Sequence, residues 1–234
     1  DSADSIKIVG NSGLGILSPT YSDKSSGELL NVLTAHLWKR RHSEFPFALD
    51  RIRFTSPVLR FENLMLLSLR IPDEELGMVE HVFLGLLRGS SLHVKNTETP
   101  LIHQKMKYIF ENRNMLVNSY DYNEVVRIFS ATPKSELFRT SRKELIQVCD
   151  GLLSVNNPNN LHCFQIKTRV SGVLKLMVVM PTSLFSEETI EQTVTLLMAK
   201  IPHQQYDWFE ARGSEKSRLH IEFELLEDSL GKSE

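Results

Sequence analysis

The segment from residue 218 to residue 226 alternates polar and apolar residues almost without interruption. A period of two places successive side chains on opposite faces of a β-strand. One face of this strand would carry Leu219, Ile221, Phe223 and Leu225, and the other His220, Glu222 and Glu224. One apolar and one polar face is typical of an antiparallel sheet with one side in water. We therefore expect antiparallel β-structure at this end of the chain.

The residues before this strand complete a ββαββ pattern. The predicted elements are a strand around Phe164 and Ile166, a strand over Val173–Met180, a helix over 187–200 capped by Ser186, and a hairpin of 206–212 with 218–226 around Gly213 and Ser214. We expect residues 161–228 to form one domain. Its four-stranded antiparallel sheet would have one face open to water and helices on the other.

Residues 115–160 are predicted to be a helical connector of two helices. The first begins around Asp121 and Glu124 and ends before Pro133, because proline cannot continue a helix. Ser141 and Glu144 have the spacing of a capping box, in which two backbone donors at a helix start are satisfied reciprocally. The polar loop Asn156–Asn160 that follows lacks apolar anchors, so we expect it to be a proteolysis-sensitive boundary.

Residues 5–114 are predicted to be a first α+β domain. Its expected elements are a short strand over Ile6–Val9, a helix over 27–42 with Ser25 and Glu28 as its capping box, β-rich stretches over 58–71 and 79–88, and a helix from Pro100 with Ile102, Met106, Ile109 and Phe110 on its buried face. The predicted fold class is thus α+β, with two units that contain antiparallel sheets joined by helices.

Composition excludes several classes of partner. The chain has 234 residues, 41% of them hydrophobic, and a net charge of −2, values that are ordinary for a soluble globular protein. This charge predicts neither a nucleic-acid nor an anionic-membrane partner. No apolar run is long enough to span a bilayer, and the N-terminus lacks the features of a signal peptide. The polar ends and the absence of an initiator Met suggest an excerpt of a longer chain.

Cys149 and Cys163 are the only cysteines. One falls on the apolar face of a predicted helix and the other in a predicted strand, so we expect both to be buried free thiols. A disulfide would require an oxidising compartment and a zinc site more ligands, which makes the cytoplasm the expected location. His162 cannot activate Cys163 as a nucleophile, because adjacent strand residues point to opposite faces.

Other candidate motifs have plain structural interpretations. The cluster Gly10, Gly13 and Gly15 has the wrong order for a dinucleotide loop, and we expect a tight turn followed by extended chain at Ile16 and Leu17. The eight histidines show no metal-binding spacing, and His81 and His103 are expected at the surface. The basic run 39–42 would complement a helix C-terminus. We therefore assign no catalytic, cofactor-binding or metal-binding residue.

Four sequence motifs, in order, resemble the N-terminal half of the large bacterial NAD-specific glutamate dehydrogenases. They are the stretch from Ile8 to Leu17, the strand Phe83–Leu87, the helix opening Pro100–Lys105, and the junction formed by Pro133, Lys134, Glu136, Leu137, Phe138 and Ser141. The chain departs from the family pattern in the stretch 57–68, where Arg60 is the charge that remains of a basic stretch.

The resemblance implies non-catalytic ACT-like and PAS-like modules that support assembly and regulation in a homo-oligomer. The catalytic lysine and the NAD-binding domain would lie elsewhere in the parent enzyme, which would convert L-glutamate and NAD to 2-oxoglutarate, ammonium and NADH. This chain itself would bind no cofactor. It also implies an amino-acid effector within residues 161–226, where the turn Arg169–Gly172 is either a binding element or a plain hairpin turn. A free-standing ACT-type amino-acid sensor is the alternative; a small hydrolase would need a nucleophile, a base and an orienting group, which the sequence does not offer.

Overall fold

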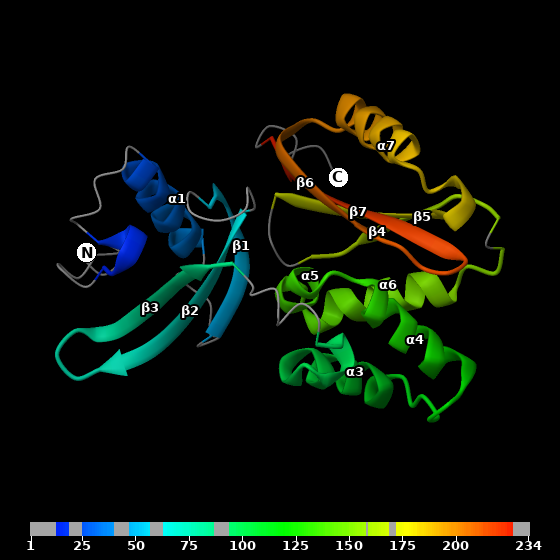
Figure 1. Cartoon of the computed structure of the whole chain (residues 1–234), viewed down its shortest axis with the longest axis horizontal. Helices are drawn as coiled ribbons and strands as arrows, with labels where there is room; N and C mark the ends of the chain where they lie inside the picture. Colours follow the sequence, from blue (N-terminus) through cyan, green and yellow to red (C-terminus); the bar gives the residue numbers. More distant parts are fainter. Residues whose placement is uncertain are drawn as a thin grey trace, which may run out of the picture. The chain divides into compact units, whose positions relative to one another are not determined.

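The computed structural model describes residues 13–18, 25–39, 47–56, 63–86, 94–157, 159–168 and 172–226. The chain divides into two compact units, a first unit over Asp1–Ser91 and a second unit over Leu92–Glu234. Figure 1 shows both, and each is described by itself. Both contain an antiparallel sheet with helices packed on it, which confirms the predicted α+β class.

The described residues of the first unit form a three-stranded antiparallel meander with one α-helix. The strands β1 (Phe47–Thr55), β2 (Asn63–Asp73) and β3 (Gly77–Gly85) lie in the order β1-β2-β3. β2 and β3 agree with the predicted stretches 58–71 and 79–88 over their described residues, whereas β1 was not anticipated. The turn between β2 and β3 is closed by the Asp73 carboxylate, which accepts the N–H groups of Glu75 and Leu76.

Helix α1 (Ser25–Lys39) covers one face of this sheet. Leu29 and Leu33 of the helix pack with Ile52, Leu64 and Leu66 of the strands in the core of the unit. The helix begins at Ser25, so this serine is its first helical residue rather than the predicted cap. The expected strand Ile6–Val9 lies outside the described residues, as do Gly10, Arg60 and residues 40–42 of the basic run.

The expected tight turn at the glycines is present in the described residues. Gly15–Leu17 form a 3₁₀ turn, η1, in which Ser18 N–H donates to the Gly15 carbonyl at 3.0 Å. The prediction of extended chain at Ile16 and Leu17 was therefore wrong. Gly15 has φ +60°, and a Cβ at Gly13 would lie 1.9 Å from the Leu17 carbonyl oxygen, so both positions require glycine.

The second unit begins with a layer of helices. After the 3₁₀ turn η2 (Asn96–Glu98) come α3 (Pro100–Asn112), α4 (Tyr120–Ala131), α5 (Lys134–Arg139) and α6 (Arg142–Leu153). The predicted start of α3 at Pro100 and its buried stripe are confirmed, with Phe110 partly buried. Ser119, not Asp121, caps α4 by accepting the Tyr122 N–H. The short helix α5 was not expected.

The predicted ββαββ pattern is confirmed. Its elements are β4 (His162–Ile166), β5 (Val173–Pro181), the turn η3 (Thr182–Leu184), α7 (Glu187–Lys200), β6 (His203–Ala211) and β7 (Lys216–Leu225). The strands lie in the order β4-β5-β7-β6, and every neighbouring pair is antiparallel. Ser186 caps α7 by accepting the Thr189 N–H, as predicted.

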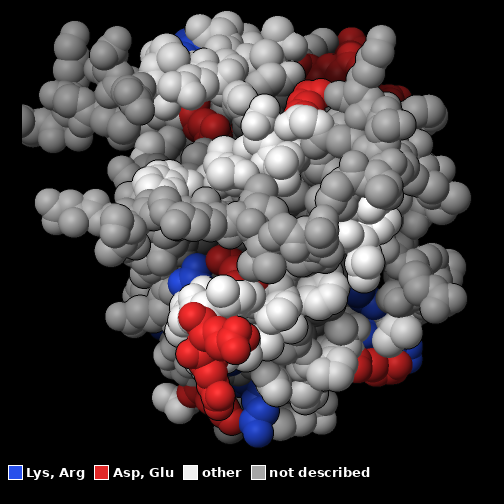
Figure 2. Space-filling view, turned by 90° about the vertical axis from the view of Figure 1, so that its left-hand side faces the viewer, with Lys and Arg blue, Asp and Glu red and all other residues white. Residues whose placement is uncertain are grey.

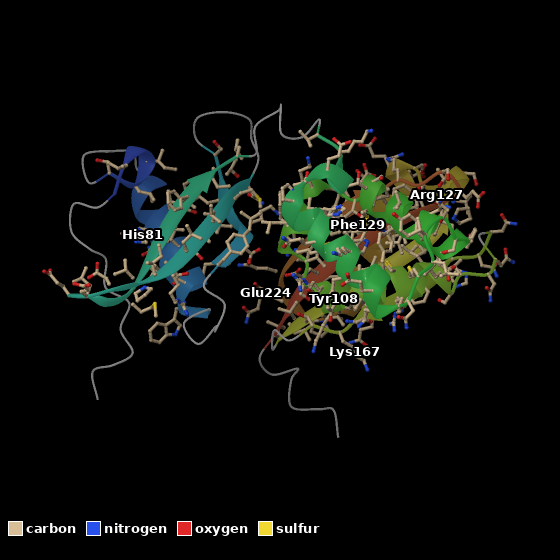
Figure 3. The ribbon with its side chains drawn as sticks, turned by 90° about the horizontal axis from the view of Figure 1, so that it is seen from below. His81, Tyr108, Arg127, Phe129, Lys167 and Glu224 are labelled. Carbon is tan, nitrogen blue, oxygen red and sulfur yellow. The ribbon has the colours of Figure 1, made fainter. Side chains whose placement is uncertain are left out.

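Helices cover both faces of this four-stranded sheet, so the expected open face was a wrong prediction. α7 packs on the face that presents Leu219, Ile221 and Phe223. The layer α3–α6 packs on the opposite face, where Met177 and Val179 join its core. Figure 3 places Phe129 within this helical layer, where it is fully buried, and Arg127, whose side chain is 63% exposed, nearer its edge. The side of β7 that carries His220 and Glu222 is therefore an interior surface.

Close packing of α6 on the sheet makes the helices and the strands one unit. A Cβ at Gly151 would lie 3.0 Å from Cε of Met177, so glycine lets the helix approach the strands. Leu152 of α6 and Ile166 of β4 share one core across the loop 154–161. The compact units meet after Ser91, whereas the expected bounds were 5–114, 115–160 and 161–228, because the expected connector and α3 pack with the sheet. Independent folding of residues 161–228 stays a prediction.

Candidate functional site

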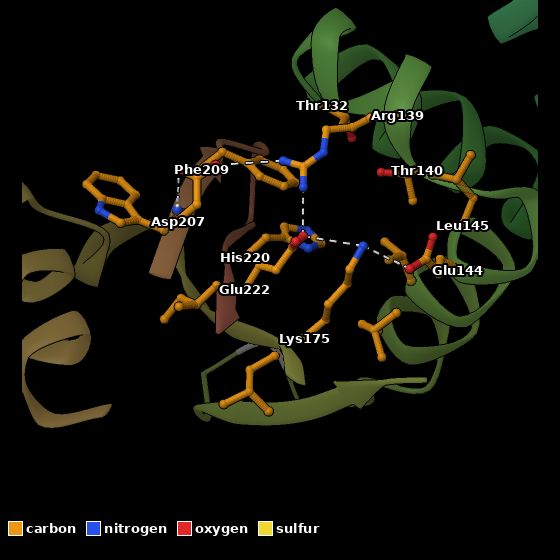
Figure 4. A pocket seen from close by; sticks show the side chains of 15 residues that line it. Thr132, Arg139, Thr140, Glu144, Leu145, Lys175, Asp207, Phe209, His220 and Glu222 are labelled. Carbon is orange, nitrogen blue, oxygen red and sulfur yellow. Dashed lines mark hydrogen bonds and ion pairs between the residues drawn. The ribbon is translucent and has the colours of Figure 1, made fainter. Parts of the chain in front are cut away.

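A charged cavity lies between the helical layer and the sheet of the second unit (Figure 4). Its volume is about 50 Å³, which exceeds the roughly 10–15 Å³ that one water molecule requires. The residues that line it are Thr132, Arg139, Thr140, Glu144, Leu145, Val148, Ile166, Lys175, Leu176, Asp207, Trp208, Phe209, His220, Ile221 and Glu222. The lining contains two cationic side chains and three carboxylates, an arrangement that is suited to the recognition of charge.

Arg139, the last residue of α5, connects the helical layer to two strands. Its guanidinium lies 2.7 Å from the Glu222 carboxylate of β7 and 3.7 Å from that of Asp207 on β6. Within α5, Glu136 approaches the same guanidinium at 3.3 Å and is itself 2% exposed. Charge-assisted contacts of this kind are stronger than neutral hydrogen bonds. Arg139 is therefore fixed from the helix side while it faces the sheet.

Lys175, on β5, makes the second link between the layers. Its Nζ lies 2.9 Å from Oε1 of Glu144 and 3.4 Å from Oε2 of Glu222. Burial opposes the charge of Lys175, but Glu222 and Glu144 outweigh that effect and raise its pKa. Burial likewise opposes the charge of Glu144, yet Lys175 and the hydrogen bonds from Ser141 lower its pKa. Both side chains are therefore ionised at neutral pH.

His220 is held neutral inside the unit. Burial, followed by the nearby charges of Arg218 and Lys175, lowers its pKa well below the ordinary histidine value. Its Nε2 accepts the Nε–H of Arg218 at 3.2 Å, and its ring stacks on Phe209 with centroids 4.4 Å apart. Because Nε2 is an acceptor here, the proton of the neutral ring resides on Nδ1.

Arg218 is a buried arginine whose charge faces a helix end. Its Nη2 donates to the Ile128 carbonyl at 2.9 Å and to Thr132 Oγ1, both at the end of α4. Burial lowers its pKa to about 10, which still leaves it charged at neutral pH. The partial negative charge at a helix C-terminus stabilises a cation placed there.

The junction 133–141, one of the four motifs behind the family resemblance, is largely buried in the helical layer. Leu137 is fully buried, Phe138 packs against the core, and the Lys134 ammonium donates to the Val94 carbonyl at 2.6 Å. Lys105 of α3 donates to the carbonyls of Leu137, Phe138 and Thr140, which closes the end of α5. Ser141 and Glu144 form the predicted capping box at the start of α6. These residue types are therefore explained by the packing of the helical layer.

Several sequence-based expectations can be placed individually. His81 and His103 are exposed, as predicted. Cys149 is buried, as predicted, but Cys163 is exposed, so the expectation of two buried thiols was wrong for Cys163. In the turn Arg169–Gly172 the structure describes Gly172, with φ 75°, and the other three positions lie outside the described residues. Within the described part of the chain, no group of His, Cys, Asp or Glu has an arrangement that could hold a metal ion.

Sequence reasoning missed the cavity. His220 and Glu222 were expected in water because they alternate with apolar residues, but the helical layer covers them. Arg139, Lys175 and Asp207 carried no motif. One signal was available. The elements that were predicted to be half-buried contain several charged residues, and buried charges are normally paired, so ion pairs between these elements could have been expected.

The surface shown in Figure 2 carries small, separate groups of acidic and basic side chains among the described residues. Over the described residues, this face has no broad field of one sign of charge. Over the residues that the structure describes, every helix falls short of the length and apolar character that a membrane-crossing helix requires.

Residues 99–157 match the family model "Glutamate dehydrogenase, helical motif 1". The matched region begins at Thr99, the N-cap of α3, and extends past the end of α6, so it coincides with the helical layer on the sheet. The match supports a chain that is related to glutamate dehydrogenases. No curated protein matched the sequence.

Proposed function

We propose that this chain is a non-catalytic assembly and regulatory region of an NAD-dependent glutamate dehydrogenase. The observation that carries the proposal is the match of residues 99–157 to the glutamate dehydrogenase helical motif. Support comes from the structure of that region, whose charged and polar residues close helix ends and bind a sheet rather than converge on a nucleophile. The parent enzyme would convert L-glutamate and NAD to 2-oxoglutarate, ammonium and NADH in the cytoplasm.

The sheets of the two units would then serve as ACT-like and PAS-like modules in a homo-oligomer. Each contains an antiparallel sheet with α1 or α7 packed on one face, and the helical layer covers the other face of the second sheet. The family resemblance implies that such modules pair and respond to metabolites. A small amino-acid effector would act through the second unit, where a charged cavity lies between part of the matched helices and the sheet. The alternative is a free-standing amino-acid sensor, which the same cavity would equally serve.

The test compares the 234-residue chain with the parent polypeptide encoded by its gene. The parent should form NADH when supplied with L-glutamate and NAD. The chain alone should form none and should show no saturable NAD binding up to about 1 mM by calorimetry, a weak affinity on the usual scale. Turnover by the isolated chain would overturn the non-catalytic assignment. A parent without a catalytic domain or without activity would overturn the dehydrogenase assignment and favour the sensor.

A further inference from the structure

Two cations converge on a single carboxylate oxygen at the edge of the cavity. Nη2 of Arg139 lies 2.7 Å from Oε2 of Glu222, and Nζ of Lys175 lies 3.4 Å from the same atom (Figure 4). A guanidinium and an ammonium directed at one oxygen form a receptor for a carboxylate. In this structure the carboxylate is supplied by the protein itself.

Each cation has a second anchor that does not involve Glu222. Glu136 holds Arg139 within α5, and Glu144 holds Lys175 from the start of α6. Both anchors are buried, with exposed side-chain fractions of 2% and 9%. The two cations would therefore stay in place if the Glu222 side chain turned away. Such preorganisation lowers the free energy that a ligand would otherwise spend on ordering the site.

The charge balance of the cavity selects the type of ligand. Its lining contains the cations Arg139 and Lys175 and the anions Glu144, Asp207 and Glu222, besides neutral His220. An added anion would increase the negative excess in a confined space, where charges are weakly screened. A zwitterion leaves the balance unchanged. Its ammonium group would also have carboxylates nearby, because Asp207 lies directly opposite Glu222 on the neighbouring strand.

We propose that this cavity binds a small α-amino acid, whose carboxylate replaces that of Glu222 between Arg139 and Lys175 and whose ammonium group is bound by Asp207. The apolar lining residues Leu145, Val148 and Ile166 would contact a short side chain. Edge strand β6 contributes Asp207, whose side chain is 30% exposed. The ligand would therefore enter along β6. This inference deepens the proposed regulatory function and rests on it for its effect on the enzyme.

Binding is measured on the 234-residue chain, with glycine, L-alanine, acetate and ethylammonium as probes at matched ionic strength. Trp38 and Trp208 are the only tryptophans, so a Trp38→Phe background leaves Trp208, the neighbour of Asp207 on β6, as the sole tryptophan reporter. Glycine or L-alanine should change this fluorescence saturably and raise the thermal midpoint. Acetate and ethylammonium should each bind at least about tenfold more weakly, because each lacks one charge-assisted contact.

Variants separate recognition from a merely structural role. Asp207→Asn should weaken glycine binding about tenfold or more but not acetate binding, since it removes the charge that the ammonium group would contact, whereas Arg139 keeps Glu136 as its anchor. Glu222→Gln should tighten acetate binding, because the internal competitor is gone. Glu224→Gln makes the same charge change on the same strand outside the cavity lining and should alter neither. Circular dichroism confirms that each variant is folded.

Two results would overturn the proposal. One is that no probe binds saturably to either the unsubstituted 234-residue chain or its Glu222→Gln variant. The other is acetate binding as tight as glycine binding, which would reveal a simple anion site. These failures leave the dehydrogenase assignment untouched, because NADH formation by the parent polypeptide is measured separately. Conversely, if the 234-residue chain bound glycine but the parent polypeptide formed no NADH from L-glutamate, the proposed function alone would be overturned.

Discussion

Oε1 of Glu144 lies 2.9 Å from the ammonium of Lys175, while Oε2 of the same carboxylate accepts the backbone N–H of Ser141 at 2.9 Å. One side chain therefore closes the start of α6 and ties that helix to β5. A capping-box glutamate normally lies at the surface. This one is 7% exposed, and its paired cation explains how its charge is tolerated in the interior.

The first prediction concerns this pair. Glu144→Gln keeps an oxygen for the Ser141 N–H but leaves the Lys175 ammonium with one carboxylate fewer, and it should lower the free energy of unfolding by about 3 kcal/mol. Lys175→Met should be of similar size. The double variant should lose less than the sum, by about 1–3 kcal/mol, in urea unfolding followed by circular dichroism. Glu111→Gln, in the exposed pair with Lys107, should change stability by less than about 1 kcal/mol.

The same pair predicts a pH dependence with two limits. The pKa of Glu144 is lowered on folding, so its contribution is present above the unfolded pKa and disappears as the pH falls through the folded pKa. The pKa of Lys175 is raised, so its contribution is present below the unfolded pKa and disappears as the pH rises through the folded one. The unfolding free energies of the unsubstituted chain and of the double variant Glu144→Gln, Lys175→Met should therefore converge in acid and in strong base. A constant difference across pH would contradict this.

A second prediction concerns Lys105, which closes the end of α5. Burial, aided by Arg142, lowers its pKa to about 8, so between that value and about 10.5 the unfolded state binds more protons than the folded state. The free energy of unfolding of the unsubstituted chain should therefore rise with pH across this window. Lys105→Met removes the donor for three carbonyls and should lower stability by about 1–3 kcal/mol. Its stability deficit should grow as the pH rises from 8 to 10.

The sequence predicted a helix or strand correctly where the residues of that segment alone specify its structure. Ser141 with Glu144, Pro100, and the alternation through Leu219 and Ile221 each specify an element through backbone hydrogen bonding or side-chain period, and those elements are present. α5 escaped notice because six residues cannot show a helical repeat, and its end depends on Lys105 from another helix.

The site could not be predicted because it depends on which layer covers which face. The polar alternation of His220 and Glu222 is the same for a strand in water and for one that meets charged partners. The partners Arg139, Lys175 and Arg218 distinguish the two cases. Arg139 is 83 residues from Glu222 in sequence, and no local pattern carries that separation.

A third prediction distinguishes the two thiols. Burial raises the pKa of Cys149 to about 12, and Cys149 is fully buried, whereas Cys163 is exposed. Because the thiolate is the reactive form, a disulfide reagent should modify one thiol per folded chain and two after denaturation. Cys163→Ser should abolish the reaction of the folded chain. Desolvation also raises the pKa of Cys163, so its reaction should be slower than that of a free thiol. Rapid modification of Cys149 under native conditions would show that α6 detaches from the sheet.

The last prediction tests the approach of α6 to the sheet at Gly151. Alanine in a helix interior stabilises by about 1 kcal/mol relative to glycine, but its Cβ would lie 3.0 Å from Cε of Met177 and 3.4 Å from the Phe164 ring. These effects oppose each other, so Gly151→Ala should change the unfolding free energy by less than about 1 kcal/mol. In a Met177→Leu background, which removes Cε, the same substitution should stabilise by about 1 kcal/mol. Gly151→Leu should destabilise by about 1–3 kcal/mol or more in either background, because the added side chain overfills the gap between helix and strands. If Gly151→Leu were neutral in urea unfolding, the helical layer would not pack on the sheet as closely as the structure shows.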